Sequence, residues 1–435
     1  SDVNFCYENF NGGTYQSKGS VLYRVDSSTG AMFLQAMLPQ KITSLKATVG
    51  TNLAIGQGDS NVWYYLTAAG GTLINGTGVA TGAPITLPIN RTTVTVTTAG
   101  TFTVTLPASG TGTATTGTAT VTGSPQALTG GANTVTITGT GTFTIDTFAV
   151  LTATDKTGCH FSAHWNDLFC YVNTSGQFYS TGTLAASPTI ATKGKIGDGS
   201  TLNNLEVYHD TALAEQVYCG TSVKTWVHDW TNAKWYPANI KYASHPNAGK
   251  GMVNHNLGLY ISMGIHVKKY SITSGTASAD PVGLDKDGGS LPIKVASTGT
   301  NYIGEFTSFI DDNDCFYGTV DSTQYGTNGY SWVAKYTGLG WQVLWTTTTL
   351  NQAMYGGIVG TVYTRRLYFD CGATLYSIPL PRVNISPKQI STSTYAASAI
   401  HVSPWFNGGS QVNDKLAQAI KTFCKDITTA EKVTV

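Results

Sequence analysis

The chain has 435 residues, of which 11% are charged and 41% hydrophobic, and its formal net charge at pH 7 is +1. So few charges argue against a disordered chain, a nucleic-acid-binding protein and a soluble helical bundle, each of which carries many more. With 49 Gly, 23 Tyr and 9 Trp, the composition favours an all-β protein with one large domain or two to three ordinary ones.

Targeting and redox signals are weak. No apolar run approaches the roughly 18 to 20 residues that span a bilayer, so we expect no membrane insertion. The first residues lack the basic segment and apolar core of a signal peptide, and we expect the chain to start at a processed or trimmed end and to continue past Val435. The seven cysteines are far apart, without a CxxC pair, which favours buried free thiols over a disulfide framework.

A short apolar run, a turn and a second apolar run recur along the chain. The runs begin at Val21, Leu53, Leu168, Val217, Leu259, Cys315 and Leu367. The later intervals are close to the period of about 40 to 50 residues that is typical of propeller blades, which predicts a six- or seven-bladed β-propeller. The interval from Val21 to Leu53 is short for a blade. Those two runs either share one blade, or the first helps to close the ring.

The interval from Leu53 to Leu168 is too long for one blade. Thr, Gly and Val dominate residues 92–147, and Arg91 is the only charged residue between Asp59 and Asp146. Alternating Thr and Val predicts strands, and the Gly-rich breaks predict turns. The alternative is a disordered Thr/Gly linker. Apolar residues at alternate positions can bury one face, which favours an inserted β-sandwich.

The predicted organisation therefore has four parts. The first propeller blades occupy residues 1–75, the inserted β-sandwich occupies 76–150, and the remaining blades occupy 151–398. Residues 399–435 form either the start of a further module or a ring closure. In this last part, apolar residues at helical spacing compete with a strand pair, and both alternatives stay open. The helical positions are Leu416, Ile420, Phe423 and Ile427.

The later repeats carry many aromatic residues. Residues 217–237 and 331–345 have the alternation of blade hairpins, and we expect their large rings to fill the space between neighbouring blades. The best-defined copy is residues 363–380, whose order of runs and turns matches that of residues 165–180. Turn residues differ between these two copies while the apolar runs persist. We therefore interpret Arg365, Arg366 and Cys371 as turn residues kept for architecture rather than for chemistry.

Catalytic and metal-binding signatures are scarce, and we expect no enzyme activity and no cofactor. The sequence contains no GxSxG, P-loop or dinucleotide fingerprint, and no repeated Asp-box. Residues 311–314 and 285–288 are rich in Asp, but neither is followed by the glutamate that completes an EF-hand loop. Solvated turns explain both stretches better than calcium sites do.

One cluster of residues is a candidate ligand site. His228 and Asp229 are adjacent to Trp226 and Trp230, and Trp235 follows after a turn. Aromatic faces beside a polar pair suit stacking against a sugar ring, which predicts a glycan-binding rim. The alternative, which we favour, is that these residues pack inside a blade.

Three stretches together resemble virion-associated β-propeller proteins of tailed bacteriophages. They are the hairpins YSWVAKYTGLGWQVLWTT and RRLYFDCGATLYSIPLP, the early Thr/Gly-rich module, and the segment from SPWFNGG to the end of the chain. The resemblance implies a tail, tail-tip or nozzle component located in the virion, either a scaffold or a host-contacting surface. It implies copies of this chain and other virion proteins as partners, with a host surface glycan as a further partner, and it transfers no catalytic residues. A lectin-like propeller and, less favoured, a glycoside hydrolase are the alternatives.

Overall fold

A computed structural model of the chain describes residues 5–380 with gaps. The gaps are residues 26, 28, 31, 39, 48–51, 59–63, 68–78, 82–84, 89–92, 99–100, 106–110, 115–116, 123–133, 147–150, 153–159, 164–168, 173–175, 182–190, 197–199, 201, 209–214, 241, 265, 274–275, 283–292, 295–300, 303, 325–328 and 339. The chain divides into two compact units, Ser1–Ser393 and Thr394–Val435. The predicted C-terminal part, 399–435, and the Asp-rich turn at 285–288 lie outside the described residues.

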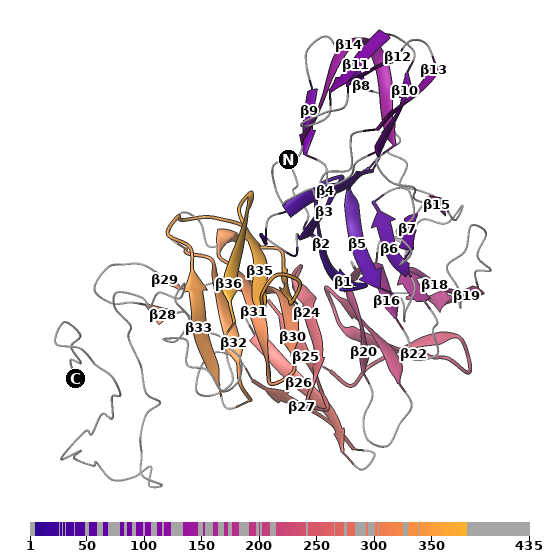
Figure 1. The fold of residues 1–435 in the computed structure, drawn as a ribbon. Coiled ribbons are helices and arrows are strands. Elements are labelled where there is room, and N and C mark those ends of the chain that lie inside the picture. Colours follow the sequence, from indigo (N-terminus) through magenta and orange to yellow (C-terminus); the bar gives the residue numbers. More distant parts are fainter. Residues whose placement is uncertain are drawn as a thin grey trace, which may run out of the picture. The chain divides into compact units, whose positions relative to one another are not determined.

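The described part of the chain is all-β and contains no α-helix (Figure 1). Its strands form successive antiparallel sheets, which we number in chain order. Sheet 1 consists of β1 (Tyr7–Phe10), β2 (Gly13–Lys18), β3 (Val21–Val25) and β4 (Met32–Met37). Sheet 2 consists of β5 (Ile42–Ala47), β6 (Asn52–Gln57), β7 (Tyr64–Thr67) and β15 (Leu151–Thr152). Sheet 3 consists of β16 (His160–Ala163), β17 (Phe169–Val172), β18 (Gln177–Thr181) and β19 (Ala191–Lys195).

The later sheets have the same order of strands. Sheet 4 consists of β20 (Leu202–Tyr208), β21 (Gln216–Thr221), β22 (Thr225–Asp229) and β23 (Lys234–Pro237). Sheet 5 consists of β24 (Ala248–His255), β25 (Gly258–Met263), β26 (His266–Thr273) and β27 (Thr276–Pro281). Sheet 6 consists of β30 (Glu305–Asp312), β31 (Cys315–Asp321), β32 (Trp332–Tyr336) and β33 (Trp341–Thr346). Sheet 7 consists of β34 (Gly357–Gly360), β35 (Arg366–Cys371) and β36 (Thr374–Pro379).

Two further groups of strands interrupt this series. Between β7 and β15, seven strands pair with one another: β8 (Val79–Thr81), β9 (Ile85–Pro88), β10 (Thr93–Thr98), β11 (Thr101–Thr105), β12 (Thr111–Ala114), β13 (Gly117–Thr122) and β14 (Thr134–Asp146). Between β27 and β30, a short pair is formed by β28 (Ile293–Lys294) and β29 (Asn301–Tyr302). The pairing of β8–β14 occurs in the Thr/Gly-rich stretch for which strands were predicted.

The first strands of successive sheets contact one another. These contacts join β1 to β5, β5 to β16, β16 to β20, β20 to β24, β24 to β30 and β30 to β34, and β34 also contacts β1. Four-stranded antiparallel sheets that meet along their first strands are the arrangement of a β-propeller. The predicted all-β, propeller-type architecture is therefore confirmed.

The recurring apolar runs correspond to one position in the sheets, with one exception. Six of the seven coincide with the second strand of a sheet, from β6 in sheet 2 to β35 in sheet 7. Val21 instead begins β3, a third strand, while the second strand of sheet 1 is the polar β2. The interval from Val21 to Leu53 was short because it joins a third strand to a second strand. The two runs belong to different sheets, so the expectation that they share a blade was wrong.

Apolar side chains fill the space between neighbouring sheets. One buried cluster joins sheets 5 and 6 and contains Tyr260 from β25, Phe316 from β31 and Trp332 from β32. Trp332 is 1% exposed. Further clusters join sheets 1 and 2, 3 and 4, 4 and 5, and 6 and 7. Full burial of one large apolar side chain contributes about 1.5 to 3 kcal/mol, so these interfaces are a major source of stability, and the prediction that aromatic rings fill the space between blades is confirmed.

The hairpin of sheet 7 shows how a turn is positioned by its glycine. Cys371 pairs with Thr374, so that Gly372 and Ala373 form the connection between β35 and β36. Gly372 has a φ of 62°, a conformation that glycine adopts without the steric cost borne by other residues. Arg366 and Cys371, which were predicted to lie in turns, are the two end residues of β35. That part of the interpretation was wrong, because the strand pairing extends one residue beyond the apolar run at one end and two at the other.

Polar contacts connect sheet 1 to sheet 7, although their residues are far apart in sequence. The Tyr7 hydroxyl donates to Asp370 Oδ1 at 2.9 Å, and Asn9 Nδ2 donates to the Val359 carbonyl at 2.7 Å. Lys18 Nζ donates to the carbonyl of Ala373 at 2.8 Å. Asp370 is fully buried and also accepts hydrogen bonds from the backbone, so its bond to Tyr7 is shielded from solvent.

We expect Tyr7→Phe to lower the free energy of unfolding by roughly 1 to 3 kcal/mol, because it removes a hydrogen bond to a buried carboxyl group while keeping the ring. Urea denaturation followed by tryptophan fluorescence measures the change. Tyr236→Phe is the matched control, since Tyr236 is 45% exposed on β23. Equal stability of the two variants and the unmodified chain would contradict the proposed importance of this contact.

Candidate functional site

The predicted glycan-binding residues lie on β22, on β23 and in the turn between them. His228 is fully buried and pairs across the strands with Trp235, which is 7% exposed. Its Nε2 lies 2.9 Å from the Lys193 carbonyl. The imidazole also contacts Phe178 and Trp235, each with ring centroids 5.0 Å apart, and Trp230 at 4.6 Å. The structure thus brings His228, Trp230 and Trp235 together as part of the packing between sheets 3 and 4.

The other two predicted residues have different surroundings. Asp229 lies at the end of β22, where its carboxylate accepts hydrogen bonds from the backbone N–H groups of Thr231 and Asn232 and from the Asn232 side chain. These hydrogen bonds lower the pKa of Asp229. Trp226 is partly buried against the same core cluster. Asp229 therefore stabilises the turn that connects β22 to β23.

Lysine ammonium groups lie over two of the tryptophan rings. Lys193 Nζ lies 5.6 Å from the ring centroid of Trp230, and Lys224 Nζ lies 5.0 Å from that of Trp226. Both distances are within the range of cation–π attraction. A sugar that stacked on either ring would have to share the ring with the lysine ammonium group above it, or displace that group. Glycan stacking by Trp226, Trp230 and Trp235 stays a prediction.

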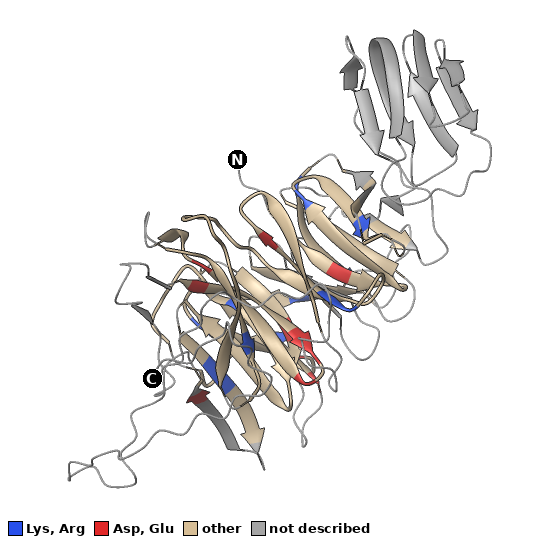
Figure 2. Cartoon of the chain, turned by 60° about the vertical axis from the view of Figure 1, so that its left-hand side comes forward, with Lys and Arg blue, Asp and Glu red and all other residues tan. Residues whose placement is uncertain are grey.

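A second candidate site is formed by charged residues on the first strands of four sheets, which we call the inner charged set. It consists of Glu8 on β1, Lys46 on β5, Glu206 on β20 and Asp311 on β30. Lys46 Nζ lies 3.7 Å from Glu8 Oε2. The charges of Lys46, Asp311 and Glu8 all act on Glu206. Figure 2 shows how few charged residues the described strands carry, so four charged residues on the first strands of different sheets, close enough to influence one another, are a concentration of charge.

Burial raises the pKa of the two glutamates in this set. Burial raises the pKa of Glu206 to about 7, and the positive charge of Lys46 opposes this rise. Burial also raises the pKa of Glu8, again opposed by Lys46. In turn, the negative charge of Glu8 raises the pKa of Lys46. Lys46 is therefore the cation whose charge lowers the pKa of both carboxyl groups against the effect of burial.

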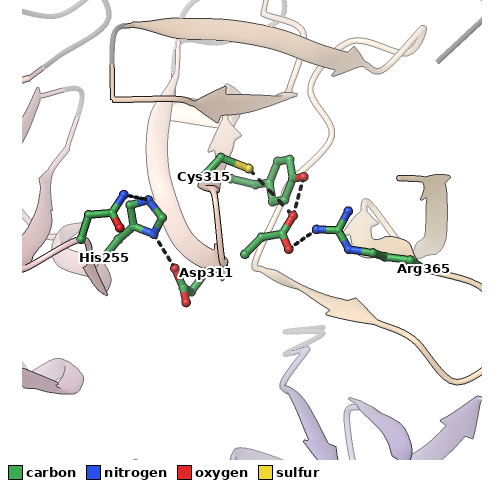
Figure 3. A network of polar contacts seen from close by, with 7 residues as sticks. His255, Asp311, Cys315 and Arg365 are labelled. Atoms are coloured by element: carbon green, nitrogen blue, oxygen red, sulfur yellow. Dashed lines mark hydrogen bonds and ion pairs between the residues drawn. The ribbon is translucent and has the colours of Figure 1, made fainter. Parts of the chain in front are cut away.

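A third group of polar residues joins sheets 5, 6 and 7 (Figure 3). His255 Nδ1 lies 2.7 Å from Asp311 Oδ1, and its Nε2 lies 3.0 Å from Asn256 Nδ2. The adjacent Asp312 forms an ion pair with Arg365 and accepts a hydrogen bond from the Tyr317 hydroxyl at 2.9 Å, as Figure 3 shows. Arg365 thus connects sheet 7 to sheet 6, in agreement with an architectural role.

The predicted solvated turn at residues 311–314 is only partly solvated. The Asp311 side chain is 52% exposed, whereas that of Asp312 is 6% exposed. Asp312 contacts both Arg365 and Tyr317. Burial raises the pKa of Tyr317, and the negative charge of Asp312 raises it further. Within the residues that the structure describes, no group of three or more His, Cys, Asp or Glu side chains is placed to hold a metal ion.

Four of the seven cysteines are described as free thiols. Cys219, Cys315 and Cys371 are buried, and Cys6 is partly buried. Burial raises the pKa of Cys371 to about 11 and that of Cys6 to about 11. A thiol with such a pKa remains protonated at neutral pH and is a poor nucleophile. These cysteines act as small apolar side chains, as the sequence predicted.

The inner charged set was missed by the sequence analysis, although a signal was present. In a chain with 11% charged residues, each of its members lies within a strand rather than in a turn. Charged residues inside short strands are unusual where both faces of a sheet are covered. What the sequence does not show is that the fold brings these four charged side chains within range of one another.

Comparison with known proteins identifies no family. No protein-family model and no curated protein matches the chain. In the described part, no helix is long and apolar enough to cross a membrane.

Solved structures give matches of low similarity. A chain in the crystal structure of the mitotic checkpoint complex has a TM-score of 0.47 at 11% identity, over 87% of this chain and 89% of that one. The β-propeller domain of Cps50 (Swd1) from Myceliophteria thermophila has a TM-score of 0.46 at 9% identity, over 88% and 98%. The extracellular domain of a putative one component system from B. thetaiotaomicron has a TM-score of 0.48 at 8% identity, over 86% of this chain and 38% of that chain. At such scores we draw no argument on fold or function from these likenesses.

If these rings stack on a sugar, we expect Trp230→Ala and Trp226→Ala to abolish glycan binding, because the aromatic face on which the sugar stacks is lost with the ring. A glycan array probed with the unmodified chain and both variants measures this. Tyr236→Ala, which removes an exposed ring from the same sheet, is the control, and circular dichroism establishes that each variant is folded. Binding that survives both tryptophan variants, or no binding to any glycan, would exclude this site.

We expect Lys46→Met to make stability more dependent on pH. A carboxyl group whose pKa is higher in the folded protein than in the unfolded chain stabilises the fold fully at a pH below its pKa in the unfolded chain. This stabilisation is lost as the pH rises through the pKa in the folded protein, which for Glu206 is about 7. Without Lys46 this loss is larger, so the variant should be less stable than the unmodified chain by about 1 kcal/mol near pH 8, with a smaller difference near pH 5.

Urea denaturation across this pH range measures the effect of Lys46→Met. Lys234→Met is the control, because Lys234 is exposed on β23. A stability difference that does not change with pH would show that Lys46 does not act on the carboxyl groups of the inner charged set.

Proposed function

We propose that sheets 1 to 7 are the blades of a closed seven-bladed β-propeller. The contact between β34 and β1 supports closure, since it joins the last sheet to the first. The hydrogen bonds of Tyr7 to Asp370 and of Asn9 to the Val359 carbonyl support it at the level of side chains. In a closed ring every blade has two neighbours, so both faces of each sheet are covered.

The strands β8 to β14 form the inserted β-sandwich of this proposal. β14 is long enough to pair at one end with β9 and β11 and at the other with β8 and β10. A strand that takes part in two sheets in this way is a common corner of a sandwich. The module enters after β7 and leaves before β15. These two strands pair directly, Leu151 with Tyr65 and Thr152 with Tyr64.

We further propose that the chain is a structural component of a phage virion tail, acting as a scaffold or host-contacting surface with no enzymatic role. The observation that supports this proposal is a series of seven sheets, with the first joined to the last through Tyr7 and Asp370, that has a second group of strands inserted between two paired strands. Such a design connects one group of β-strands directly to another, as suits a scaffold. The proposed partners are copies of this chain and other virion proteins, with a host surface glycan as the alternative ligand, and the proposed location is the virion.

The side chains that are buried between the sheets also suit a scaffold. The described cysteines are free and mostly buried, the polar groups that reach between sheets are paired with one another, and aromatic rings occupy the interfaces. None of these features depends on a bound substrate. In an assembled particle, neighbouring subunits cover the outer strand edges, which protects an all-β component outside a cell.

The test is to look for the chain in purified virus particles. We expect mass spectrometry to detect its peptides in gradient-purified virions at a constant ratio to other tail proteins. Cryo-electron microscopy should place a seven-bladed ring in the tail. Recovery of the chain only as a free monodisperse monomer, absent from every particle, would overturn the virion role.

A variant lacking the inserted module separates its role from that of the propeller. Replacing residues 76–150 by a short Gly-Ser turn removes β8 to β14 and retains β7 and β15. If the propeller makes the assembly contacts, this variant is still incorporated into particles. Failure of an otherwise folded variant to be incorporated would assign assembly to the module instead.

A further inference from the structure

The connection between β23 and β24, residues 238–247, contacts three neighbouring sheets, and we call it the strap. The structure describes it apart from residue 241. The His245 N–H donates at 2.7 Å to the carbonyl of Ser222, which lies in the turn between β21 and β22 of sheet 4. Side chains of the strap contact Glu305 at the start of β30 in sheet 6. Because the strap itself leads into sheet 5, it joins sheets 4, 5 and 6.

The strap ends in a tight turn that leads into β24. The Ala248 N–H donates to the His245 carbonyl at 3.0 Å, which is the hydrogen bond of a β-turn. Pro246 suits the second position of such a turn, since its ring fixes φ near the required value. The turn also brings the Asn247 N–H to the imidazole of His245, where Nδ1 accepts it at 3.2 Å. One ring nitrogen is therefore a hydrogen-bond acceptor.

The other ring nitrogen faces a buried carboxylate. His245 Nε2 lies 3.1 Å from Glu305 Oε1, and Glu305 Oε2 accepts a hydrogen bond from Asn247 Nδ2. The Glu305 side chain is 4% exposed, whereas that of His245 is 34% exposed. A carboxylate accepts hydrogen bonds and does not donate them, so Nε2 carries a proton that it donates to Glu305. The two contacts together select the neutral imidazole with its proton on Nε2.

The backbone of sheet 5 also lies against this imidazole. Gly264, in the turn between β25 and β26, has a φ of 72°, and a Cβ built at this position would lie 3.0 Å from His245 Nδ1. The Gly264 carbonyl accepts a hydrogen bond from the Phe306 N–H at 3.0 Å. The ring is therefore positioned by the backbone of sheet 5 and by the carboxylate of Glu305 in sheet 6.

Two further charged residues lie near this pair in the described part of the chain. Asp321 on β31 pairs across the strands with Glu305. Its Oδ1 accepts hydrogen bonds from the backbone and the hydroxyl of Thr323, at 2.7 and 2.6 Å. Burial lowers the pKa of Lys250 on β24, and the charges of Asp321 and Glu305 oppose this. His245 thus lies among Glu305, Asp321 and Lys250, and it contacts Glu305.

Protonation of His245 changes one of its two hydrogen bonds and keeps the other. A proton on Nδ1 places two N–H donors opposite each other, so the bond from the Asn247 N–H is lost. The bond from Nε2 to Glu305 becomes an ion pair, which holds the ring where it is. The backbone of the turn must then move away from the ring. Histidine is the side chain that ordinarily changes charge between about pH 5 and 8.

We propose that His245 is a pH-sensitive latch, whose protonation releases the turn at residues 245–248 and loosens the strap that joins sheets 4, 5 and 6. In its neutral form the imidazole connects the backbone of the turn to Glu305. In its protonated form it stays paired with Glu305 alone. This inference depends on the contacts of the strap and not on a role in a virion.

Hydrogen–deuterium exchange of the full chain at single-residue resolution tests the proposal. The protection of the Asn247 amide is compared at about pH 8 and about pH 5, after correction for the intrinsic exchange rate at each pH. In the unmodified chain we expect this protection to fall by about tenfold or more at the lower pH, because the bond to Nδ1 is lost. Amides of β25 and β26, which pair with each other, should keep their protection and show that sheet 5 remains folded.

His245→Gln is the test variant, because a glutamine amide also offers an acceptor and donors but does not titrate. Its Asn247 amide should be as protected at about pH 5 as at about pH 8. His266→Gln is the control, since His266 is exposed on β26, and it should show the same fall in protection as the unmodified chain. An equal fall in His245→Gln would assign the effect to Glu305 or Asp321 and overturn the proposal.

The titration of the imidazole provides a second measurement that does not depend on the glutamine variant. In protein with isotope-labelled histidine, the ring signal of His245 is assigned through its contact with Gly264 and followed by NMR over the same pH range. The midpoint of its titration should coincide with the midpoint of the loss of protection at Asn247. A ring that does not titrate over this range, or protection at Asn247 that does not change in the unmodified chain, would also overturn the proposal.

Discussion

The structure depends on the need to cover both faces of every sheet. Each sheet is an antiparallel series of short strands with apolar residues on both sides, and it becomes stable only between two neighbours. Aromatic and aliphatic clusters provide this cover from one sheet to the next. A linear row of sheets would leave two outer faces exposed. Hydrogen bonds of Tyr7 and Asn9 join the first sheet of the series to sheet 7, which supports the closed ring that we propose.

The scarcity of charge follows from the same constraint. Of the few acidic residues, Asp370 joins sheet 1 to sheet 7, Asp312 joins sheet 6 to sheet 7 through Arg365, and Glu206 lies among the first strands. Burying a carboxyl group is costly unless donors or a cation compensate. Asp370 has three such donors, and Glu206 has the charge of Lys46. At least three acidic residues of this sparsely charged chain thus act between sheets.

Periodicity along the chain predicted more of this structure than residue chemistry did. The apolar runs that begin at Val217, Leu259, Cys315 and Leu367 mark second strands, whose residues are almost all buried. Sheet 1 does not follow this pattern, because its second strand, β2, has a polar sequence although it is buried. The inner charged set was missed because it joins residues as distant as Glu8 and Asp311. His228 was proposed as a ligand residue from its neighbours in sequence, whereas its burial depends on Phe178 from another sheet.

The connection of the inserted strands to sheet 2 has a mechanical consequence. Any pull on that module reaches the propeller through β7 and through β15, which has only two residues. Both strands are loaded from the same end, so their hydrogen-bonded pairs open one after another rather than all together. β15 is therefore the first element to detach under tension, while β5 and β6 stay paired. A joint that opens one pair at a time, while the strands behind it stay paired, is a compliant attachment for the inserted strands.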